Sequence, residues 1–211
     1  MTAELPDFEM QIKRKLARES APLREALARY VRLAANFQHS ARLTSFAPGE
    51  LVDELALESL RLLELGPVAN GARAVDLGSG VGAPVVPLAL ALPQVAFTAV
   101  EVAERRAAFL RHAKALLGLS NLDVLQLTAQ QLAKQQPAAF DLLTSRAFAP
   151  PQKLLPLALR LLKPGGEMRG YLGGEPEVLQ QCAAEQGFSV AKLRSYTFGE
   201  SPRHVYLLHK S

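Results

Sequence analysis

The chain has 211 residues, of which 49% are hydrophobic and 21% charged, and its 24 Lys and Arg against 20 Asp and Glu give a net charge of +4. This composition is typical of a soluble globular protein and excludes disordered, collagen-like and coiled-coil chains. The length fits a single α/β unit with a short extension, and the modest positive charge is compatible with a polyanionic partner without being diagnostic of one.

The first third of the chain carries a helical pattern. Apolar residues recur at helical spacing over residues 8–37, which predicts one or two helices, and again over residues 49–65, which predicts another. Gly66-Pro67 and Asn70-Gly71 then interrupt the pattern. We therefore expect an N-terminal helical extension over residues 1–66 and a main domain over residues 67–211.

In the main domain, short apolar strands alternate with helices. The predicted strands cover residues 73–77, 95–101, 123–127, 140–145 and 167–172, and the predicted helices cover residues 84–92, 103–117, 130–134, 151–162 and 176–185. This alternation predicts a doubly wound, mostly parallel α/β sheet with right-handed crossovers. Residues 188–197 and 204–209 follow closely on one another, so we expect them to pair as an antiparallel hairpin.

A glycine-rich loop is the most informative motif. The stretch DLGSGVGA, residues 76–83, stands between a predicted strand and a predicted helix. Glycines there allow a ligand to approach the backbone closely, and the start of a helix offers free N–H groups. Glu101 ends the next predicted strand, where a carboxylate accepts hydrogen bonds from both hydroxyls of a ribose. The pattern predicts a ligand that contains a nucleoside.

Two cofactor classes fit this spacing. Gly78, Gly80 and Ala83 also satisfy the dinucleotide fingerprint in its Gly/Ala form, so an NAD(P)-dependent oxidoreductase remains an alternative. Asp76 favours S-adenosylmethionine, because a carboxylate at the tip of the strand repels a pyrophosphate but suits a cationic amino acid moiety. A P-loop ATPase is excluded, since no Gly-Lys-Ser/Thr follows the glycines.

Other features bear on the cellular location of the protein and on whether it holds disulfides or metals. The single cysteine, Cys182, excludes an intramolecular disulfide framework and multi-cysteine zinc sites, and the four histidines lack metal-ligand spacing. The N-terminus is acidic before any apolar run, unlike a secretory signal, and prolines interrupt the apolar stretch at residues 81–100. We expect a cytoplasmic monomer that binds no metal and no membrane.

Several short motifs together carry a family resemblance. They are PVVPLA at residues 84–89, SRAFA at 145–149, RHV at 203–205, LTS at 43–45, LES at 57–59 and RRAAFLR at 105–111. In this order and spacing, over roughly residues 30 to 210, the chain resembles the glucose-inhibited division protein B family. The members of that family are small-subunit ribosomal RNA guanine-N7 methyltransferases.

The resemblance implies a Rossmann-like class I methyltransferase sheet, S-adenosylmethionine as cofactor, and small-subunit ribosomal RNA or the subunit particle as partner. The implied reaction is methylation of a guanine N7 in 16S ribosomal RNA. The implied cofactor-binding residues are Asp76, Gly78, Gly80, Ala83, Glu101, Ala129, Gln130 and Arg146. Arg146 and Arg203 are the predicted catalytic residues, and Arg42, Arg203 and His204 are the predicted substrate-binding residues. A surface ion pair is the alternative interpretation of Arg146 and Arg203.

The implied chemistry needs little from the protein besides alignment. Guanine N7 has an available lone pair and loses no proton on methylation, so no general base is required. The sequence SRAF at residues 145–148 also differs from the Asp/Asn-Pro-Pro-aromatic motif of enzymes that methylate exocyclic amines.

The chain departs from the usual family pattern at Arg42, Leu55, Glu58, Thr128, Gln130 and Gly173-Gly174. Leu55 stands where the family has a histidine, and Thr128 and Gly173 stand where it has basic residues. Because phosphate contacts dominate nucleic-acid affinity, these losses motivate a second hypothesis. In it, the chain is a catalytically weak paralogue that binds S-adenosylmethionine and RNA.

Overall fold

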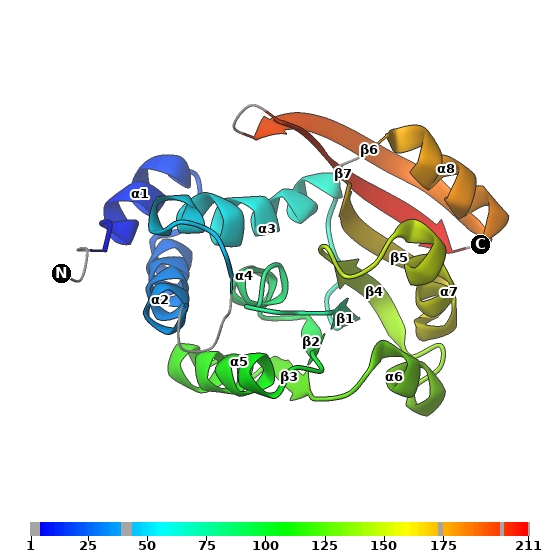
Figure 1. Ribbon diagram of the computed structural model, residues 1–211, viewed down its shortest axis with the longest axis horizontal. Coiled ribbons are helices and arrows are strands. Elements are labelled where there is room, and N and C mark those ends of the chain that lie inside the picture. Colours follow the sequence, from blue (N-terminus) through cyan, green and yellow to red (C-terminus); the bar gives the residue numbers. More distant parts are fainter. Residues whose placement is uncertain (1–4, 39–43, 173–174, 199–200, 211) are drawn as a thin grey trace.

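Seven strands form one sheet at the centre of the molecule, in the order β3-β2-β1-β4-β5-β7-β6 (Figure 1). The computed structural model describes residues 5–38, 44–172, 175–198 and 201–210. The strands are β1 (Arg73–Leu77), β2 (Ala96–Val100), β3 (Leu122–Leu125), β4 (Phe140–Ser145), β5 (Leu162–Leu172), β6 (Phe188–Phe198) and β7 (Ser201–Lys210). The first five are parallel, whereas β7 runs antiparallel to both β5 and β6. The predicted doubly wound fold with a terminal hairpin is confirmed.

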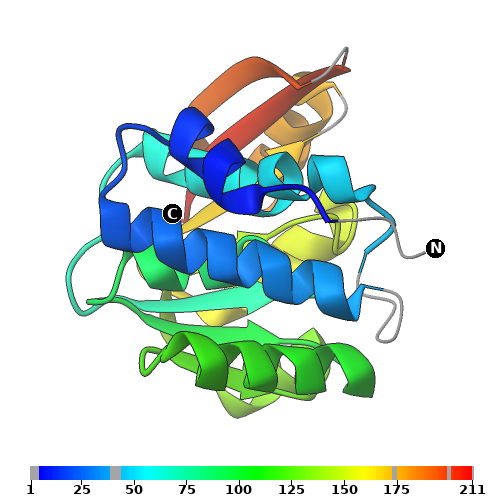
Figure 2. The ribbon, with the colours of Figure 1, turned by 90° about the vertical axis from the view of Figure 1, so that its left-hand side faces the viewer.

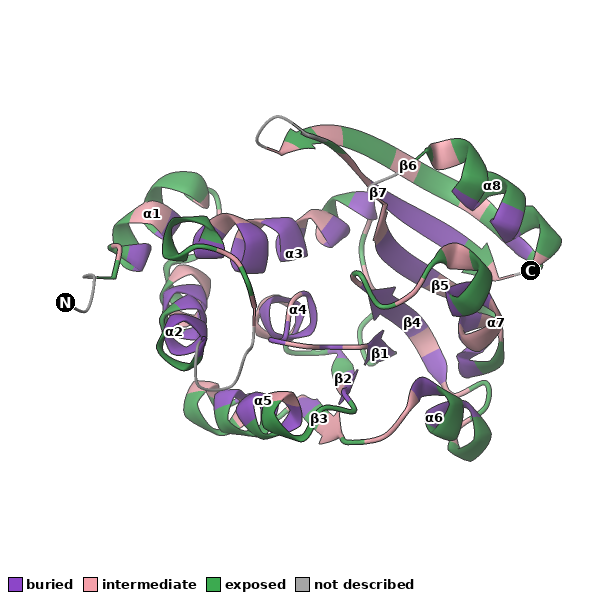
Figure 3. Cartoon of the chain, in the orientation of Figure 1, coloured by how far each residue is buried: buried purple, intermediate pink, exposed green. Residues whose placement is uncertain are grey.

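Helices cover both faces of this sheet. They are α1 (Phe8–Lys15), α2 (Ala21–Phe37), α3 (Glu58–Leu60), α4 (Val85–Ala91), α5 (Glu104–Leu117), α6 (Ala129–Gln135), α7 (Pro151–Leu161) and α8 (Pro176–Glu185). One face carries α4 and α5, and the other carries α6, α7 and α8 (Figures 1 and 3). Central strands such as β1 are buried on both faces, which explains their nearly continuous apolar sequence.

The N-terminal helices add a further layer outside α4 and α5 (Figure 2). Ser20 caps α2 by accepting from the N–H of Leu23, and the apolar stripe of α2 is buried against the main domain. Phe8, Leu27 and Phe97 therefore belong to one hydrophobic cluster that runs from the extension into the sheet. The division at residues 66 and 67 stays a prediction.

The segment predicted as one helix over residues 49–65 is irregular, so that prediction is wrong in detail. It contains a 3₁₀ turn at Pro48–Glu50, a π-helix at Val52–Leu57, the short α3, and a second 3₁₀ segment at Arg61–Leu65. Two side chains compete with the helical hydrogen bonds there. Ser59 Oγ donates to the carbonyl of Leu55 at 2.6 Å, and Tyr171 Oη donates to the carbonyl of Glu58 at 2.9 Å.

Two further boundaries differ from the predictions. β5 begins at Leu162, earlier than the predicted residue 167, because Leu162 pairs with Phe140 ahead of a bulge in the β4–β5 ladder. The hairpin of β6 and β7 also extends to Phe198 and Ser201, beyond both predicted ends. Among the described residues, no helix is long and apolar enough to cross a membrane, and no group of three or more His, Cys, Asp or Glu is placed to hold a metal ion.

Candidate cofactor and substrate site

The carboxyl ends of β2, β1 and β4 meet at one edge of the sheet. The last residues of these strands are paired side by side, so the residues that follow them, Glu101, Gly78 and Arg146, emerge next to one another. The order of strands reverses between β1 and β4, and ligands of open α/β sheets bind in the crevice outside such a switch point. The structure thus brings together three of the predicted cofactor-binding residues.

Asp76 is buried at the end of β1 with an incomplete set of hydrogen bonds. Its side chain is 1% exposed, and Thr144 Oγ1 donates to its Oδ1 at 2.7 Å. Its Oδ2 is buried and has no hydrogen-bond partner among the described residues. Burial raises the pKa of Asp76 to about 6. A buried carboxylate oxygen without a partner is a good acceptor for an ammonium group of a ligand.

The glycine loop is held against β2 by its backbone. The N–H groups of Gly78 and Ser79 both donate to the carbonyl of Val100, at 2.9 and 3.1 Å. Gly78 has a φ of +70°, a conformation that residues with a Cβ rarely adopt. Tyr30 of α2 donates its buried hydroxyl to the carbonyl of Val81 at 3.0 Å, so the N-terminal extension also fixes this loop.

Glu101 is 5% exposed and binds the loop in the same region. Its Oε2 accepts from the N–H of Gly80 at 2.8 Å, and its Oε1 accepts from the N–H of Ala103 at 2.8 Å. Each carboxylate oxygen has a second lone pair, so both remain able to accept from a ribose hydroxyl. The loop and its acidic partner are therefore already assembled in the position that the spacing predicted.

Phe148 covers the glycine loop from the side of β4, which sequence reasoning missed. A Cβ built on Gly78 would lie 2.6 Å from Cδ2 of Phe148, so the ring packs directly on the glycine. Ala147, just before it, has a φ of +53°, which turns the chain sharply after Arg146. A glycine at residue 78 is thus required both by its backbone conformation and by the ring of Phe148.

The remaining predicted cofactor residues lie at the rims of the crevice. Ala129 is buried at the start of α6 and Gln130 is exposed, while Thr128 caps this helix through a reciprocal pair of hydrogen bonds with Gln131. Ala83 precedes Pro84, and α4 begins at Val85, one residue later than predicted.

Arg146 and Arg203 meet in a second part of the site, where both bind acidic residues. Arg146 donates to the side chain of Glu54, and Arg203 Nη2 donates to Glu54 Oε1 at 2.9 Å. Arg203 Nη1 also lies 3.2 Å from Glu58 Oε2. The hydrogen bonds that Arg203 donates to Glu54 raise the pKa of Arg203 above its ordinary value. Both arginines therefore form ion pairs, as the alternative interpretation expects, but the acids they bind are buried and the arginines themselves are only partly exposed.

The other predicted substrate-binding residues do not join this cluster. Successive residues of a strand point to opposite faces, so His204 faces away from Arg203. His204 Nδ1 is hydrogen-bonded to Ser195 Oγ at 2.9 Å, which places it on the side of the hairpin away from Glu54. Arg42 lies outside the described residues, as do Gly173 and Gly174.

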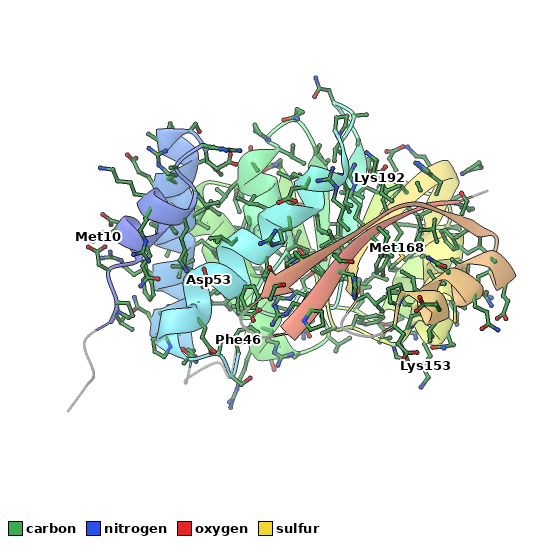
Figure 4. All side chains as sticks on the ribbon, turned by 90° about the horizontal axis from the view of Figure 1, so that it is seen from above. Met10, Phe46, Asp53, Lys153, Met168 and Lys192 are labelled. Atoms are coloured by element: carbon green, nitrogen blue, oxygen red, sulfur yellow. The ribbon has the colours of Figure 1, made fainter. Side chains whose placement is uncertain are left out.

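Glu54, Phe46 and Tyr171 are site residues that sequence reasoning missed. Glu54 and Glu58 are buried in a segment whose neighbours are mostly apolar, and this pair of acids four residues apart on an apolar face was the available signal. Phe46, labelled in Figure 4, lies in the wall of the cavity that Arg203 also lines.

Comparison with known proteins places this geometry in context. A family model described as rRNA small subunit methyltransferase G (GidB) matches residues 23–206. The chain is 33% identical over 210 residues to the ribosomal RNA small subunit methyltransferase G of Xanthomonas axonopodis pv. citri, covering 97% of this chain and 96% of that protein.

Solved structures share the fold. TrmN from Thermus thermophilus is 25% identical with a TM-score of 0.61, covering 80% of this chain and 55% of that one. A SAM-dependent methyltransferase from Aquifex aeolicus is 20% identical with a TM-score of 0.56, covering 75% of this chain and 92% of that one, a likeness of fold alone.

Proposed function

Because the chain belongs to the rRNA small subunit methyltransferase G family, we propose that it transfers a methyl group from S-adenosylmethionine to N7 of a guanine in 16S ribosomal RNA. The observation that supports this most is the buried Asp76 beside the glycine loop. Its Oδ2 has no hydrogen-bond partner within the described part of the chain, and an ammonium group would complete its bonding. A pyrophosphate would be repelled there, so the oxidoreductase alternative is not retained.

The residues of the crevice fit this cofactor in their chemistry. We assign the amino group of S-adenosylmethionine to Asp76, the ribose hydroxyls to Glu101, and the approach of the backbone to Gly78 and Gly80. The proposed set also includes Ala83, Ala129, Gln130 and Arg146. The sulfonium of the bound cofactor supplies an electrophilic methyl group.

What the protein contributes to the reaction is alignment. Guanine N7 attacks with its own lone pair and releases no proton, so the site needs no general base. Arg146 follows β4 directly, between the cofactor crevice and the cavity that Arg203 lines. A base held in that cavity would therefore reach the crevice with the guanidinium groups beside it.

The substrate is proposed to be 16S ribosomal RNA, naked or within the small subunit. Arg203 is proposed to contact the base, whereas His204, on the opposite face of β7, is proposed to contact the RNA outside the cavity. The cytoplasmic location and the monomeric state stay predictions.

A second candidate function is binding of S-adenosylmethionine and RNA without efficient turnover. One observation favours it: Glu54 and Glu58 neutralise Arg146 and Arg203, the residues predicted to meet the RNA. Turnover separates the two candidates, because only the enzyme transfers methyl groups.

The decisive experiment is calorimetric titration with S-adenosylhomocysteine, followed by tritiated methyl transfer to bacterial 16S RNA and to small subunits. We expect binding at one site per chain and transfer that maps to a guanine N7. Binding without transfer to any RNA substrate would favour the second candidate, and an absence of binding would contradict the cofactor assignment.

A further inference from the structure

A cavity of about 230 Å³ lies at the carboxyl ends of β4 and β5, next to the cofactor crevice. Its wall combines side chains of opposite charge with aromatic rings, namely Glu54, Glu58, Arg146, Arg203, Phe46 and Tyr171. The guanidinium carbon of Arg146 lies 5.7 Å from the ring centre of Phe46 and 5.6 Å from that of Tyr171. Rings and guanidinium planes are the surfaces on which proteins stack unpaired bases.

The two acids of the cavity are more deeply buried than the arginines they hold. The side chains of Glu54 and Glu58 are 4% and 1% exposed, whereas those of Arg146 and Arg203 are 16% and 30% exposed. Glu58 additionally accepts from Arg61 Nε at 3.0 Å and from Tyr196 Oη at 2.5 Å. The acids thus lie at the buried bottom of the cluster, and the guanidinium groups lie closer to the solvent.

The irregular helix explains why both acids reach this position. Glu54 lies within the π-helix Val52–Leu57 and Glu58 follows directly in α3. A π turn widens the helix and is often found at functional sites. Tyr171 of β5 holds the carbonyl of Glu58, so the sheet itself keeps the segment in this form.

The contacts with Glu54 use both terminal nitrogens, Nη1 and Nη2, of each arginine, which form the edge that a guanidinium uses for bidentate binding. Arg203 directs Nη1 and Nη2 to Glu54, and Arg146 Nη1 and Nη2 are directed to the backbone carbonyl and the carboxylate of Glu54. A free arginine binds guanine most often through O6 and N7 together. That contact would cover the atom which must be methylated, so a methyltransferase for N7 needs arginines that are held back from it.

The charge of the cavity also discriminates against phosphate. A phosphate group that entered would meet two carboxylates as well as two guanidinium groups, so its attraction to the arginines is largely cancelled and its desolvation is not repaid. A neutral base meets no such penalty, and its edge presents both acceptors and donors. The chemistry of the wall therefore suits a guanine base better than the RNA backbone.

We propose that Glu54 and Glu58 are positioning residues that engage the bidentate edges of Arg146 and Arg203, so that the cavity receives the target guanine with N7 uncovered. This inference rests on the proposed function, since it deepens the assignment of the same site. It gives the N-terminal extension a direct part in the active site.

The variant Glu54→Gln tests the proposal, because it removes the charge and keeps the shape. We expect kcat to fall roughly 10- to 100-fold, as for a small misplacement of a substrate-positioning group. We expect the affinity for S-adenosylhomocysteine to stay the same. Non-specific RNA binding should become more salt-dependent, with a slope steeper by about 0.7 for each guanidinium released toward phosphate.

Two further variants separate positioning from a merely structural role. Glu54→Asp keeps the charge and should recover part of kcat. Asp53→Asn is the matched control, because Asp53 lies in the same turn but pairs with Lys15, away from the cavity. A loss of thermal stability together with cofactor affinity in Glu54→Gln, or an unchanged kcat and salt slope, would overturn the proposal.

One readout needs neither RNA nor turnover. In ¹⁵N-labelled protein, the Nε–H signals of Arg146 and Arg203 should shift in Glu54→Gln and stay in place in Asp53→Asn. If the wild-type protein methylates no RNA, the proposed function fails while these signals and the salt slope still decide the positioning role. Unshifted arginine signals in Glu54→Gln would contradict that role whatever the wild-type activity.

Discussion

Thr144 donates its hydroxyl to Oδ1 of Asp76 at 2.7 Å, across the pair of β1 and β4, where the two residues stand directly opposite each other. This bond fixes the orientation of the carboxyl group. It leaves Oδ2 buried at the switch point, without a partner in the described ranges. This geometry supports the proposal that Asp76 binds a cation, whereas the simpler interpretation of a carboxylate in this position is a cap for the loop.

The variant Asp76→Asn should lose most of its affinity for S-adenosylhomocysteine, because a neutral amide cannot offer a charge-assisted bond to the ammonium group. We expect at least a roughly 10-fold weaker Kd in calorimetry, in line with about 1.5 to 3 kcal/mol for a hydrogen bond to a charged group. The exposed Asp123→Asn, which removes a surface pair with Lys114, is the control and should bind normally. Equal affinity in both variants would sink the assignment of Asp76.

Binding should depend on pH through the same group. Burial raises the pKa of Asp76 to about 6, so the carboxylate that binds an ammonium group is lost progressively below that pH. We expect the affinity for S-adenosylhomocysteine to fall by about tenfold per pH unit below 6, and Asp76→Asn to show no such dependence. A flat profile from pH 5 to pH 8 in the wild type would contradict this.

The stability of the cofactor-free protein should change with pH in the direction opposite to that of cofactor binding. A carboxyl group whose pKa is raised by folding favours the folded state below its unfolded pKa of 3.8, and this contribution is lost as the pH rises through about 6. At pH 8, Asp76→Asn should therefore unfold at higher urea concentration than the wild type. Its free energy of unfolding should be larger by up to about 3 kcal/mol, because folding raises the pKa of Asp76 from 3.8 to about 6. At pH 4 the two proteins should differ much less, and a variant less stable at pH 8 would refute the cause given for the shift.

Gly78→Ala should both destabilise the protein and abolish cofactor binding. The added Cβ would meet the ring of Phe148, and the φ of +70° costs a residue with a Cβ about 1 to 2 kcal/mol. Adding Phe148→Ala should remove the clash but not the backbone strain, so urea denaturation should recover only part of the lost stability. Full recovery in the double variant would show that the backbone conformation contributes nothing.

Arg169→Met should be strongly destabilising. Arg169 is 1% exposed in β5 and donates to the carbonyls of Leu62, Gly66 and Pro67, and it pairs with Glu167. Its loss would leave a buried carbonyl, two partly buried carbonyls and a carboxylate without their partner, a cost of about 3 to 5 kcal/mol. The matched change Arg194→Met, at an exposed pair with Glu64, should cost less than about 0.5 kcal/mol in the same urea titration.

Much of the fold was predictable because local patterns and global topology agree. The alternation of apolar strands with helices predicted that β1 to β5 run parallel, and the closeness of the last two segments predicted the hairpin. The exact limits escaped prediction where tertiary contacts decide them. The early start of β5 depends on the pairing of Leu162 with Phe140, and the π-helix depends on the hold of Tyr171 on the carbonyl of Glu58.

The meeting of the proposed cofactor-binding residues at one edge of the sheet was also predictable from the chain, because these residues follow strand ends at fixed spacings. Asp76, Gly78 and Glu101 meet where the sequence indicated, since residues after neighbouring parallel strands emerge at one edge. Phe148 was not predicted as a neighbour of Gly78, because its ring reaches the loop only through the turn at Ala147.

The sequence by itself thus determined the class of fold and the family, and it predicted a place for the nucleoside site, because these depend on periodicity and on motifs close together in the chain. Only the tertiary structure decided what Arg146 and Arg203 bind. Arg203 lies 149 residues from Glu54, and no local pattern states which of many acids a guanidinium will meet. The partner is selected by burial, because a charge taken out of water is tolerated only where the fold supplies its opposite within hydrogen-bond distance.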